Sequence, residues 1–302
     1  MAFNIASILF DIILPIFIII GIGVVFDIAF KPDARTLSKL NFYLFVPAIV
    51  FISMLDAAVP ASSLLVLIVF NVIHFVIITS IAFASFSLKW FKEKRNVLTM
   101  GSGFYNAGNY GIPFTILAFG GGYLDIIAII MVLQNLYMFT FGLWLLEREH
   151  KSIKEILIGF AKIPVIYALI GGMVLNLLNI DLIPQVKEPL TYIADGVIPL
   201  ALLTLGMQLA RVKLTKNSVH VVAMTIMRLI ISPIIALVLV LIFQIQGILA
   251  SIMIVTSGLP VAVNTYILSL EYNQDADLAS QGIFWSTLLS VASLSVLLLL
   301  FG

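Results

Sequence analysis

Long apolar runs separated by short polar clusters extend along the whole chain. A membrane-spanning helix needs about 20 consecutive, mainly apolar residues, and runs of that length recur from one end to the other. The pattern predicts an all-α polytopic membrane protein with ten transmembrane helices. The predicted spans cover residues 7–30, 37–56, 62–88, 96–119, 123–146, 156–179, 189–210, 217–245, 247–270 and 278–301.

The composition supports a membrane protein and excludes several classes of chemistry. Of the 302 residues, 62% are hydrophobic and 10% are charged, whereas about 25% of the residues in a soluble domain are charged. The net charge of +1 provides no basic surface for nucleic acid. With no cysteine and three widely spaced histidines, the sequence holds no local metal motif. We expect no cofactor and no metal.

The basic residues indicate how the chain is oriented. Because Lys and Arg concentrate in cytoplasmic loops, the crowded side is predicted to be cytoplasmic. This places both termini outside a plasma membrane, with an even number of spans. The first apolar run has no basic region before it and is too long for a signal peptide, so it is predicted to be the first span. Fourteen of the 16 basic residues lie in odd-numbered connections, at positions 31, 35, 39, 89, 92, 94, 95, 148, 151, 154, 162, 211, 213 and 216.

Four landmark residues recur after a nearly constant interval, which favours two repeats. Five spans separate the partners, and because five is odd, the second repeat enters the membrane inverted. The alternative is chance, since proline is common in membrane helices. We predict a first five-helix repeat over residues 1–150 and an inverted second one over 151–302. The pairs are Pro15 with Pro164, Pro47 with Pro199, Pro113 with Pro260, and Asp125 with Asp277.

Spans 4 and 9 combine Gly and Pro in mid-membrane, in the stretches GSGFYNAGNYGIPF and TSGLPVAVNTYIL. Proline removes a backbone donor and glycine permits non-helical geometry, so both helices are predicted to break. Freed backbone groups are tolerated at that depth only where they pack in protein or line a wet cavity. The N-terminus of a half-helix facing such a cavity favours an anion.

Neutral side chains surround these breaks, and each amide both donates and accepts hydrogen bonds. They are the candidate binding residues for the carboxylate of a small organic anion. The alternative is that these amides tie neighbouring helices together, a contact usually worth under ~1 kcal/mol. The candidates are Asn106, Asn109, Tyr110, Pro113, Gln134, Asn135, Pro260, Asn264 and Thr265.

A few ionisable residues fall within or beside the spans, where charge is costly. Arg228 lies well inside span 8, and we expect either a structural ion pair with Asp195 or attraction of an anionic substrate. His74 could relay protons or bond to a neighbouring helix, and is not assigned to a site. No nucleophile, general base or aligned carboxylate pair occurs at a catalytic spacing, so an enzyme is not expected. Asp11, Asp27 and Asp56 are expected near span ends, and Glu271 is a further ionisable residue at depth.

Four stretches, in this order, resemble the auxin efflux carrier family, within the superfamily that includes the bile acid and sodium symporters. The similarity extends over essentially the whole chain. The stretches are Asn106 followed after four residues by Gly111-Ile112-Pro113; Val132-Leu133-Gln134 with an aromatic-rich run; Arg228 with four residues before Pro233; and Leu259-Pro260 followed by SLEYN and an acidic loop.

The resemblance implies an architecture and a mechanism. Broken helices 4 and 9 cross, spans 1, 2, 6 and 7 form a scaffold, and spans 3–5 and 8–10 form a transport domain that moves like an elevator. It also implies a homodimer formed through the scaffold. Asn106 is similar to the residue that meets the substrate carboxylate, with Gln134 in the same pocket, and the substrates implied are auxin-like indole acids or malate and malonate-type acids.

Two departures from the family pattern limit this transfer. Ile163-Pro164 stands where the family often has Asn-Pro, and Asn71 aligns with an acidic residue of plant exporters. Two other readings remain. One is a sodium-coupled symporter of the bile acid type, although sodium sites usually include a carboxylate. The other is a membrane sensor with a transporter-like fold. The expected partners are the anion, the lipid bilayer and a second copy of the chain.

Overall fold

The computed structural model describes residues 4–57, 61–146, 163–213 and 218–302, and each regular element in those ranges is a helix. Seven of these described helical stretches are long and apolar enough to cross a membrane, which confirms a polytopic membrane protein. The total of ten spans and the inverted repeats stay predictions. The seven stretches are Ile5–Phe30, Ala34–Leu55, Ser63–Phe86, Gly121–Leu146, Pro184–Ala210, Val219–Ile242 and Ala276–Phe301, and shorter apolar helices cover Pro164–Leu177 and Gly247–Ser257.

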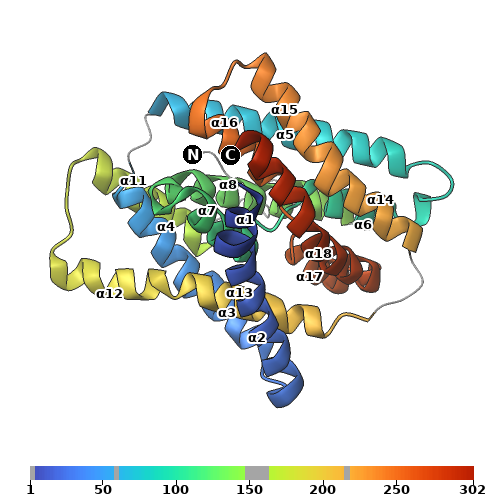
Figure 1. Cartoon of the computed structure of the whole chain (residues 1–302), viewed down its shortest axis with the longest axis horizontal. Coiled ribbons are helices and arrows are strands. Elements are labelled where there is room, and N and C mark those ends of the chain that lie inside the picture. The colour runs from blue at the N-terminus through green and yellow to red at the C-terminus, as the bar shows by residue number, and fades with distance from the viewer. Residues whose placement is uncertain (1–3, 58–60, 147–162, 214–217) are drawn as a thin grey trace.

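The helices pack side by side into one bundle (Figure 1). In the first half of the chain they are α1 (Ile5–Ser7), α2 (Leu14–Phe30), α3 (Ala34–Leu40), α4 (Val46–Leu55), α5 (Ala61–Phe86), α6 (Arg95–Gly103), α7 (Ile112–Phe119), α8 (Leu124–Tyr137) and α9 (Leu143–Leu146). In the second half they are α11 (Pro164–Leu177), α12 (Pro184–Asp195), α13 (Val197–Ala210), α14 (Ser218–Ile226), α15 (Ser232–Ile242), α16 (Gly247–Ser257), α17 (Asn264–Glu271) and α18 (Ala276–Phe301).

Short wide turns of π-helix interrupt several of these helices. Such turns often mark functional sites, because the extra residue changes the direction of the side chains. Three of them carry polar residues that matter below: η2 (Asn41–Phe45), η4 (Ala107–Gly111) and η7 (Met227–Ile231). Two further π-helical turns are η1 (Ile8–Ile13) and η6 (Met138–Gly142), and two short 3₁₀ turns are η3 (Lys92–Lys94) and η5 (Gly121–Tyr123).

Glycines hold two pairs of helices in backbone contact. A Cβ on Gly206 of α13 would lie 2.0 Å from the carbonyl oxygen of Ile20 in α2, so no larger residue fits there. Gly172 of α11 packs in the same way on α4, 2.5 Å from the carbonyl oxygen of Phe51. Small residues at helix contacts are the main device for close packing in lipid. Each of these two pairs joins a helix from the first half of the chain to one from the second.

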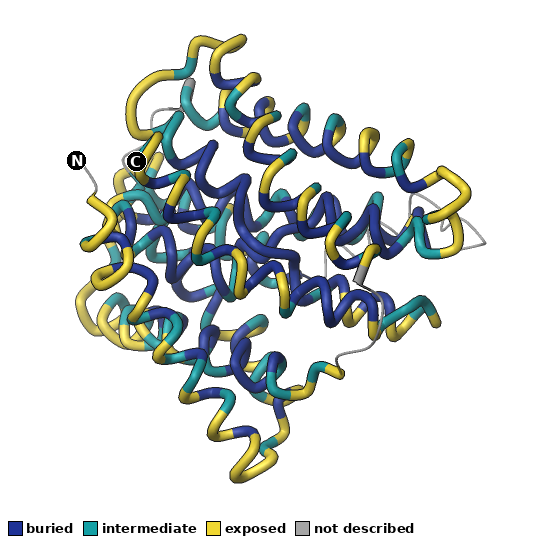
Figure 2. Tube along the Cα trace, turned by 45° about the vertical axis from the view of Figure 1, so that its right-hand side comes forward, coloured by how far each residue is buried: buried dark blue, intermediate teal, exposed yellow. Residues whose placement is uncertain are grey.

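Large apolar side chains cover much of the outer surface. Phe10, Ile28, Leu241 and Leu300 are each about two-thirds exposed, and Figure 2 shows exposed positions along the outer sides of the helices, with buried positions inside. In water this surface would be unfavourable, but in a bilayer it contacts lipid tails. The fold therefore has an outside suited to hydrocarbon and a centre that can hold polar groups.

The two interrupted helices meet at that centre; the Gly and Pro pattern predicted both breaks, and the family resemblance implied that the helices cross. The first breaks between α6 and η4, and the second between α16 and α17. The N–H of Asn106 donates to the carbonyl oxygen of Pro260 at 2.9 Å, and the N–H of Ala262 donates to that of Phe104 at 3.0 Å. These bonds form a small antiparallel bridge at Tyr105 and Val261. Backbone groups freed at one break thus form hydrogen bonds with groups freed at the other. In the low-dielectric interior such groups need a partner.

Candidate functional site

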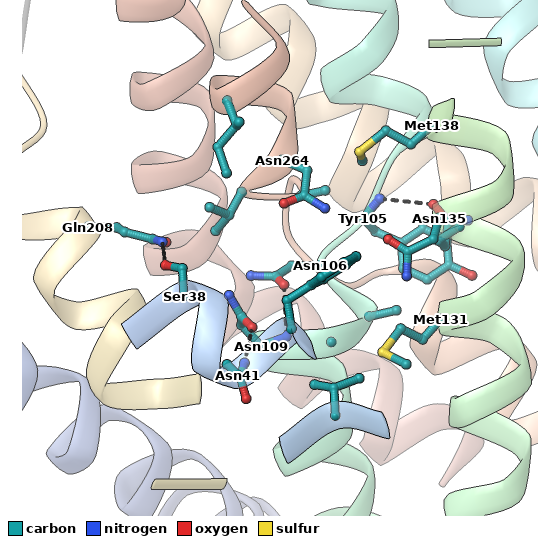
Figure 3. A pocket seen from close by; sticks show the side chains of 18 residues that line it. Ser38, Asn41, Tyr105, Asn106, Asn109, Met131, Asn135, Met138, Gln208 and Asn264 are labelled. Atoms are coloured by element: carbon teal, nitrogen blue, oxygen red, sulfur yellow. Dashed lines mark hydrogen bonds between the residues drawn. The ribbon is translucent and has the colours of Figure 1, made fainter. Parts of the chain in front are cut away.

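A cavity of about 100 Å³ lies beside the junction of the two interrupted helices. It is bounded by the junction, α8, α17, the α3–η2 segment and α13 (Figure 3). No lining residue is charged, and the apolar part of the wall includes Phe42, Met131 and Met138. Among the described residues, no group of three or more His, Cys, Asp or Glu could hold a metal ion. The polar lining residues are Ser38, Asn41, Tyr105, Asn106, Asn109, Gln134, Asn135, Gln208 and Asn264.

Asn106 is the best-positioned ligand group in this cavity. It is 5% exposed and is the N-cap of η4, where its Oδ1 accepts from the N–H of Asn109 at 3.1 Å. Its Nδ2 is buried with no hydrogen-bond partner. A buried amide donor without a partner loses free energy, of the order of 1–3 kcal/mol. Asn106 therefore presents a free donor beside the cavity, suited to an acceptor such as a carboxylate oxygen.

The N-terminal ends of two helical segments add positive electrostatic potential at the cavity. Both segments that continue after the breaks begin beside the cavity: η4 and α7 follow Asn106, and α17 begins at Asn264. The N-terminal end of a helix carries a partial charge of about +0.5, which falls off within a turn. Two such ends at one cavity favour an anion without any cationic side chain.

Other amides fix the shape of the wall. Gln134 on α8 is buried, and its Oε1 accepts from the N–H of Tyr105 at 3.3 Å. Asn109 accepts from Nδ2 of Asn41 at 2.9 Å, which ties η4 to η2. These bonds hold the junction, α8 and η2 in register around the cavity (Figure 3).

The structure brings together five of the predicted binding residues and leaves four outside the cavity. Asn106, Asn109, Gln134, Asn135 and Asn264 line it. Their role in binding a substrate stays a prediction.

Of the four predicted residues outside the cavity, Tyr110 is fully buried and its hydroxyl accepts from Ser290 at 3.1 Å. Pro113 lies buried in α7, and Pro260 contributes its carbonyl oxygen to the junction. Thr265 is 0% exposed, with a hydroxyl that has no partner. None of these four residues lines the cavity.

Sequence reasoning missed Ser38, Asn41, Tyr105 and Gln208. Gln208 is the only amide in the apolar run of α13, which was an available signal. Its Nε2 donates to Ser38 at 3.4 Å, and its Oε1 is buried without a partner. Asn41 lies at the start of η2, where the sequence alone looked like an ordinary span entrance. Ser38, Asn41 and Gln208 line the cavity from α3, η2 and α13, whereas Tyr105 belongs to the junction itself.

Arg228 corrects an expectation. The predicted ion pair with Asp195 does not form in the described structure, and the alternative, attraction of an anionic substrate, stays a prediction. Asp195 is exposed at the end of α12, whereas Arg228 is 0% exposed and does not line the cavity. Its guanidinium instead donates to backbone carbonyl oxygens and to Ser232. It also lies over the Tyr105 ring, 4.9 Å from the ring centroid.

His74 belongs to the same buried cluster as Arg228. Its Nε2 lies 3.0 Å from the carbonyl oxygen of Ser232, which can only accept, so this nitrogen carries the proton. The bond links α5 to α15, which matches the interpretation of a histidine bonded to a neighbouring helix. Asn71, one turn earlier in α5, accepts from the Tyr105 hydroxyl at 3.1 Å.

Acidic residues near the span ends differ in their surroundings. Asp11 and Asp56 are exposed, as expected, and Glu271 is exposed as well. Asp27 is not: it is 6% exposed and pairs with Arg211, at 2.6 Å between Oδ1 and Nη2. This ion pair ties the end of α2 to the end of α13 and lies away from the junction.

Comparisons with known proteins agree with this geometry. A family model described as "Membrane transport protein" matches residues 8–298. A protein of Methanothermobacter thermautotrophicus described as an uncharacterized transporter is 28% identical over 271 residues, covering 87% of this chain and 88% of its own length. An uncharacterized transporter of Methanocaldococcus jannaschii is 26% identical over 294 residues, covering 93% and 95%. The family confirms the resemblance drawn from the motifs, and the chain therefore belongs to the membrane transport protein family, that of the auxin efflux carriers.

Proposed function

We propose that this protein is a secondary transporter that binds a small organic anion in the cavity beside the junction of the two interrupted helices. One observation carries the proposal: the buried Nδ2 of Asn106 has no partner and lies at the cavity, beside the N-terminal ends of two helices. A carboxylate oxygen supplies the missing acceptor. Its charge is matched by two helix ends of about +0.5 each.

The neutral wall suits a carrier that must also release its substrate. A lysine or arginine in direct contact would hold a carboxylate by a charge-assisted bond roughly twice as strong as a neutral one. Here the lining groups are amides, hydroxyls and apolar side chains. Methionine and phenylalanine accept the rest of the molecule, so both indole acids and short dicarboxylic acids stay within the proposed substrate class.

The proposed mechanism is alternating access of the elevator type. The scaffold consists of α2, α4, α11 and α13, joined by the glycine contacts, and α5–α9 with α14–α18 form the moving part. The cavity lies between them: Asn41 and Gln208 come from spans 2 and 7, whereas Asn106 and Asn264 come from the interrupted helices. A site at such a boundary alternates its access when one part slides against the other.

Internal symmetry supports the inverted repeats within this proposal. Gly23 contacts the backbone of α13 and Gly172 contacts the backbone of α4, and the two glycines lie 149 residues apart. Pro15 and Pro164 have the same separation. Both views place the two ends of the chain close together (Figures 1 and 2), which fits an even number of spans. Both termini outside the plasma membrane and a homodimer through the scaffold complete the proposal.

The test is substrate binding by purified Asn106→Ala. Indole-3-acetate, malate and malonate are the probes, each measured by thermal shift and by currents on solid-supported membranes. The variant is expected to fold and to lose at least about tenfold in affinity, since one hydrogen bond to a charged group is worth about 1.5–3 kcal/mol. Saturable binding of one acid class by the wild type also identifies the substrate.

Asn176→Ala is the matched control. Asn176 is an amide of α11 that donates to the carbonyl oxygen of Leu55 at 2.7 Å, away from the cavity. Its loss lowers the melting temperature and leaves affinity unchanged. Wild-type affinity in Asn106→Ala, or equal losses in the two variants, removes Asn106 and the cavity from the binding site.

A further inference from the structure

The strongest feature outside the cavity is the environment of Arg228. This residue lies on η7, between α14 and α15, and no part of it is exposed. Nη1 donates to the carbonyl oxygen of Ser102 at 2.8 Å, and Nη2 donates to the carbonyl oxygen of Ser257. The Ser232 hydroxyl supports the second contact by donating to the same carbonyl at 2.9 Å.

The two carbonyls occupy corresponding places, each in the C-terminal turn of the helical segment that precedes a break. Ser102 is in the last turn of α6, which ends at Gly103, and Ser257 is the last residue of α16. The last four carbonyls of a helix have no partner within it, and this end carries a partial charge of about −0.5. Two such ends amount to about −1, which is the charge that one guanidinium neutralises.

Among the described residues, no carboxylate forms an ion pair with Arg228. The ion pairs found in the described part of the chain join Lys94 to Asp275, Lys187 to Asp56 and Arg211 to Asp27. The groups facing Arg228 are neutral: backbone carbonyls, Ser232 and the face of Tyr105. A buried charge needs compensation, and here the two helix ends provide it.

The junction therefore separates two kinds of charge. The starting ends of η4 and α17 lie at the cavity and attract an anion, whereas the finishing ends of α6 and α16 meet Arg228 on the other side of Tyr105. In ion-coupled carriers with broken helices, carbonyls and finishing ends of this kind coordinate the coupling cation. Here the Arg228 guanidinium takes the place of such a cation, and it is covalently part of the protein.

We propose that Arg228 is a built-in substitute for a coupling cation, which neutralises the carbonyl ends of both interrupted helices and makes the junction independent of sodium. The proposal goes beyond the proposed substrate site, and its main readout is the stability of the protein without substrate. Arg228 is thus a positioning residue that holds the two breaks together. Removing its side chain leaves a cavity with the electrostatics of a monovalent cation site.

The experiment compares melting temperatures of wild type, Arg228→Ala and Lys187→Ala in detergent. Arg228→Ala is expected to melt lower than wild type, and millimolar guanidinium chloride raises its melting temperature by a few degrees, while urea at the same concentration does not. Sodium raises it relative to choline at equal ionic strength. Wild type responds to neither ion. Lys187→Ala, which removes an exposed cation paired with Asp56, also shows no rescue.

Three results overturn the proposal. One is stabilisation of wild type by sodium over choline, which is measurable whether or not any variant folds. Another is Arg228→Ala that folds but responds to guanidinium no more than to urea. The third is a neutral Arg228→Met variant with wild-type stability. Since no substrate is present in these measurements, failure to bind an organic anion would refute the proposed function without affecting this result.

Discussion

The two sides of the helix junction use the same elements for opposite purposes. On the cavity side, Asn106 keeps an unpartnered donor next to two helix beginnings. On the other side, the last carbonyls of α6 and α16 are bonded to Arg228. A polar group that already has a partner contributes to folding, whereas a buried one without a partner costs free energy until a ligand arrives. The cavity side keeps a donor available for a ligand, whereas on the other side the helix-end carbonyls are already bonded within the protein.

The largest expected effect is on the cavity side, from Asn106→Asp. Aspartate caps a helix as well as asparagine does, so the bond from the N–H of Asn109 persists, but a buried carboxylate without a cation lowers the stability. The donor is lost and a negative charge faces the anion. We expect affinity to fall about 10- to 100-fold, corresponding to about 1.4 kcal/mol per tenfold. Titration calorimetry and melting curves on the same sample check both parts, and tight binding by this variant contradicts the assignment.

The next effect belongs to the support side, from Ser232→Ala. This hydroxyl donates to the carbonyl of Ser257 and accepts from Arg228. Its removal is expected to lower the free energy of unfolding by about 1 kcal/mol, with unchanged affinity for the anion. Denaturation monitored by tryptophan fluorescence measures the loss. A change in affinity without a change in stability would reverse the roles given to the two sides.

Thr265→Val tests a residue that the sequence assigned to the binding site. Its hydroxyl is buried without a partner and does not line the cavity. Valine has nearly the same shape and no polar atom, so we expect a gain in unfolding free energy of about 1 kcal/mol and wild-type binding. Reduced affinity in a stable Thr265→Val protein would return this residue to the site.

The smallest effect lies outside the membrane-spanning part, at the ion pair of Lys94 with Asp275, 2.6 Å apart. Burial alone would raise the pKa of Asp275, but the hydrogen bonds from Lys94 and from the N–H of Leu278 outweigh it, so the pKa lies below its ordinary value of 3.8. The pair therefore stabilises the fold above pH 3.8, and the gain disappears as pH falls through the lowered pKa.

Lys94→Ala is accordingly expected to cost under about 1 kcal/mol at neutral pH, since the pair is partly exposed. The difference from wild type shrinks on acidification below pH 3.8. Melting temperatures along a pH series measure it. A difference that grows towards low pH would show that Lys94 acts through another partner.

The sequence revealed the interrupted helices because their cause is local. Gly and Pro change the backbone at their own positions. Each break could therefore be predicted from one short stretch of sequence, and the first stretch also contains Asn106. Gln134 was proposed as a neutral amide on span 5 near the breaks, and the family resemblance implied the same position; its contact with Tyr105 appeared only in the structure.

The missed features depend on partners that a sequence does not display. Arg228 was predicted to pair with Asp195 because a sequence shows only side-chain charges. In the structure its partners are backbone carbonyls. Tyr110 was placed in the site because it is a neutral polar residue at the first break, but on the wide turn η4 Asn109 lines the cavity and Tyr110 does not. Gln208 lines the cavity from another span, α13, and no local sequence pattern links that span to Asn106.

The glycine contacts have a consequence for how the chain is made. Synthesis delivers the N-terminal half to the membrane first, yet Gly23 of α2 packs on α13, and α4 receives Gly172 of α11. Helix α4 lacks this partner until the chain has been inserted as far as Leu177, the last residue of α11, and α2 lacks its partner until Ala210, the last residue of α13. During that interval the contact surfaces of α2 and α4 face lipid or the insertion machinery, so the first half waits in the membrane for the second before its own packing is complete.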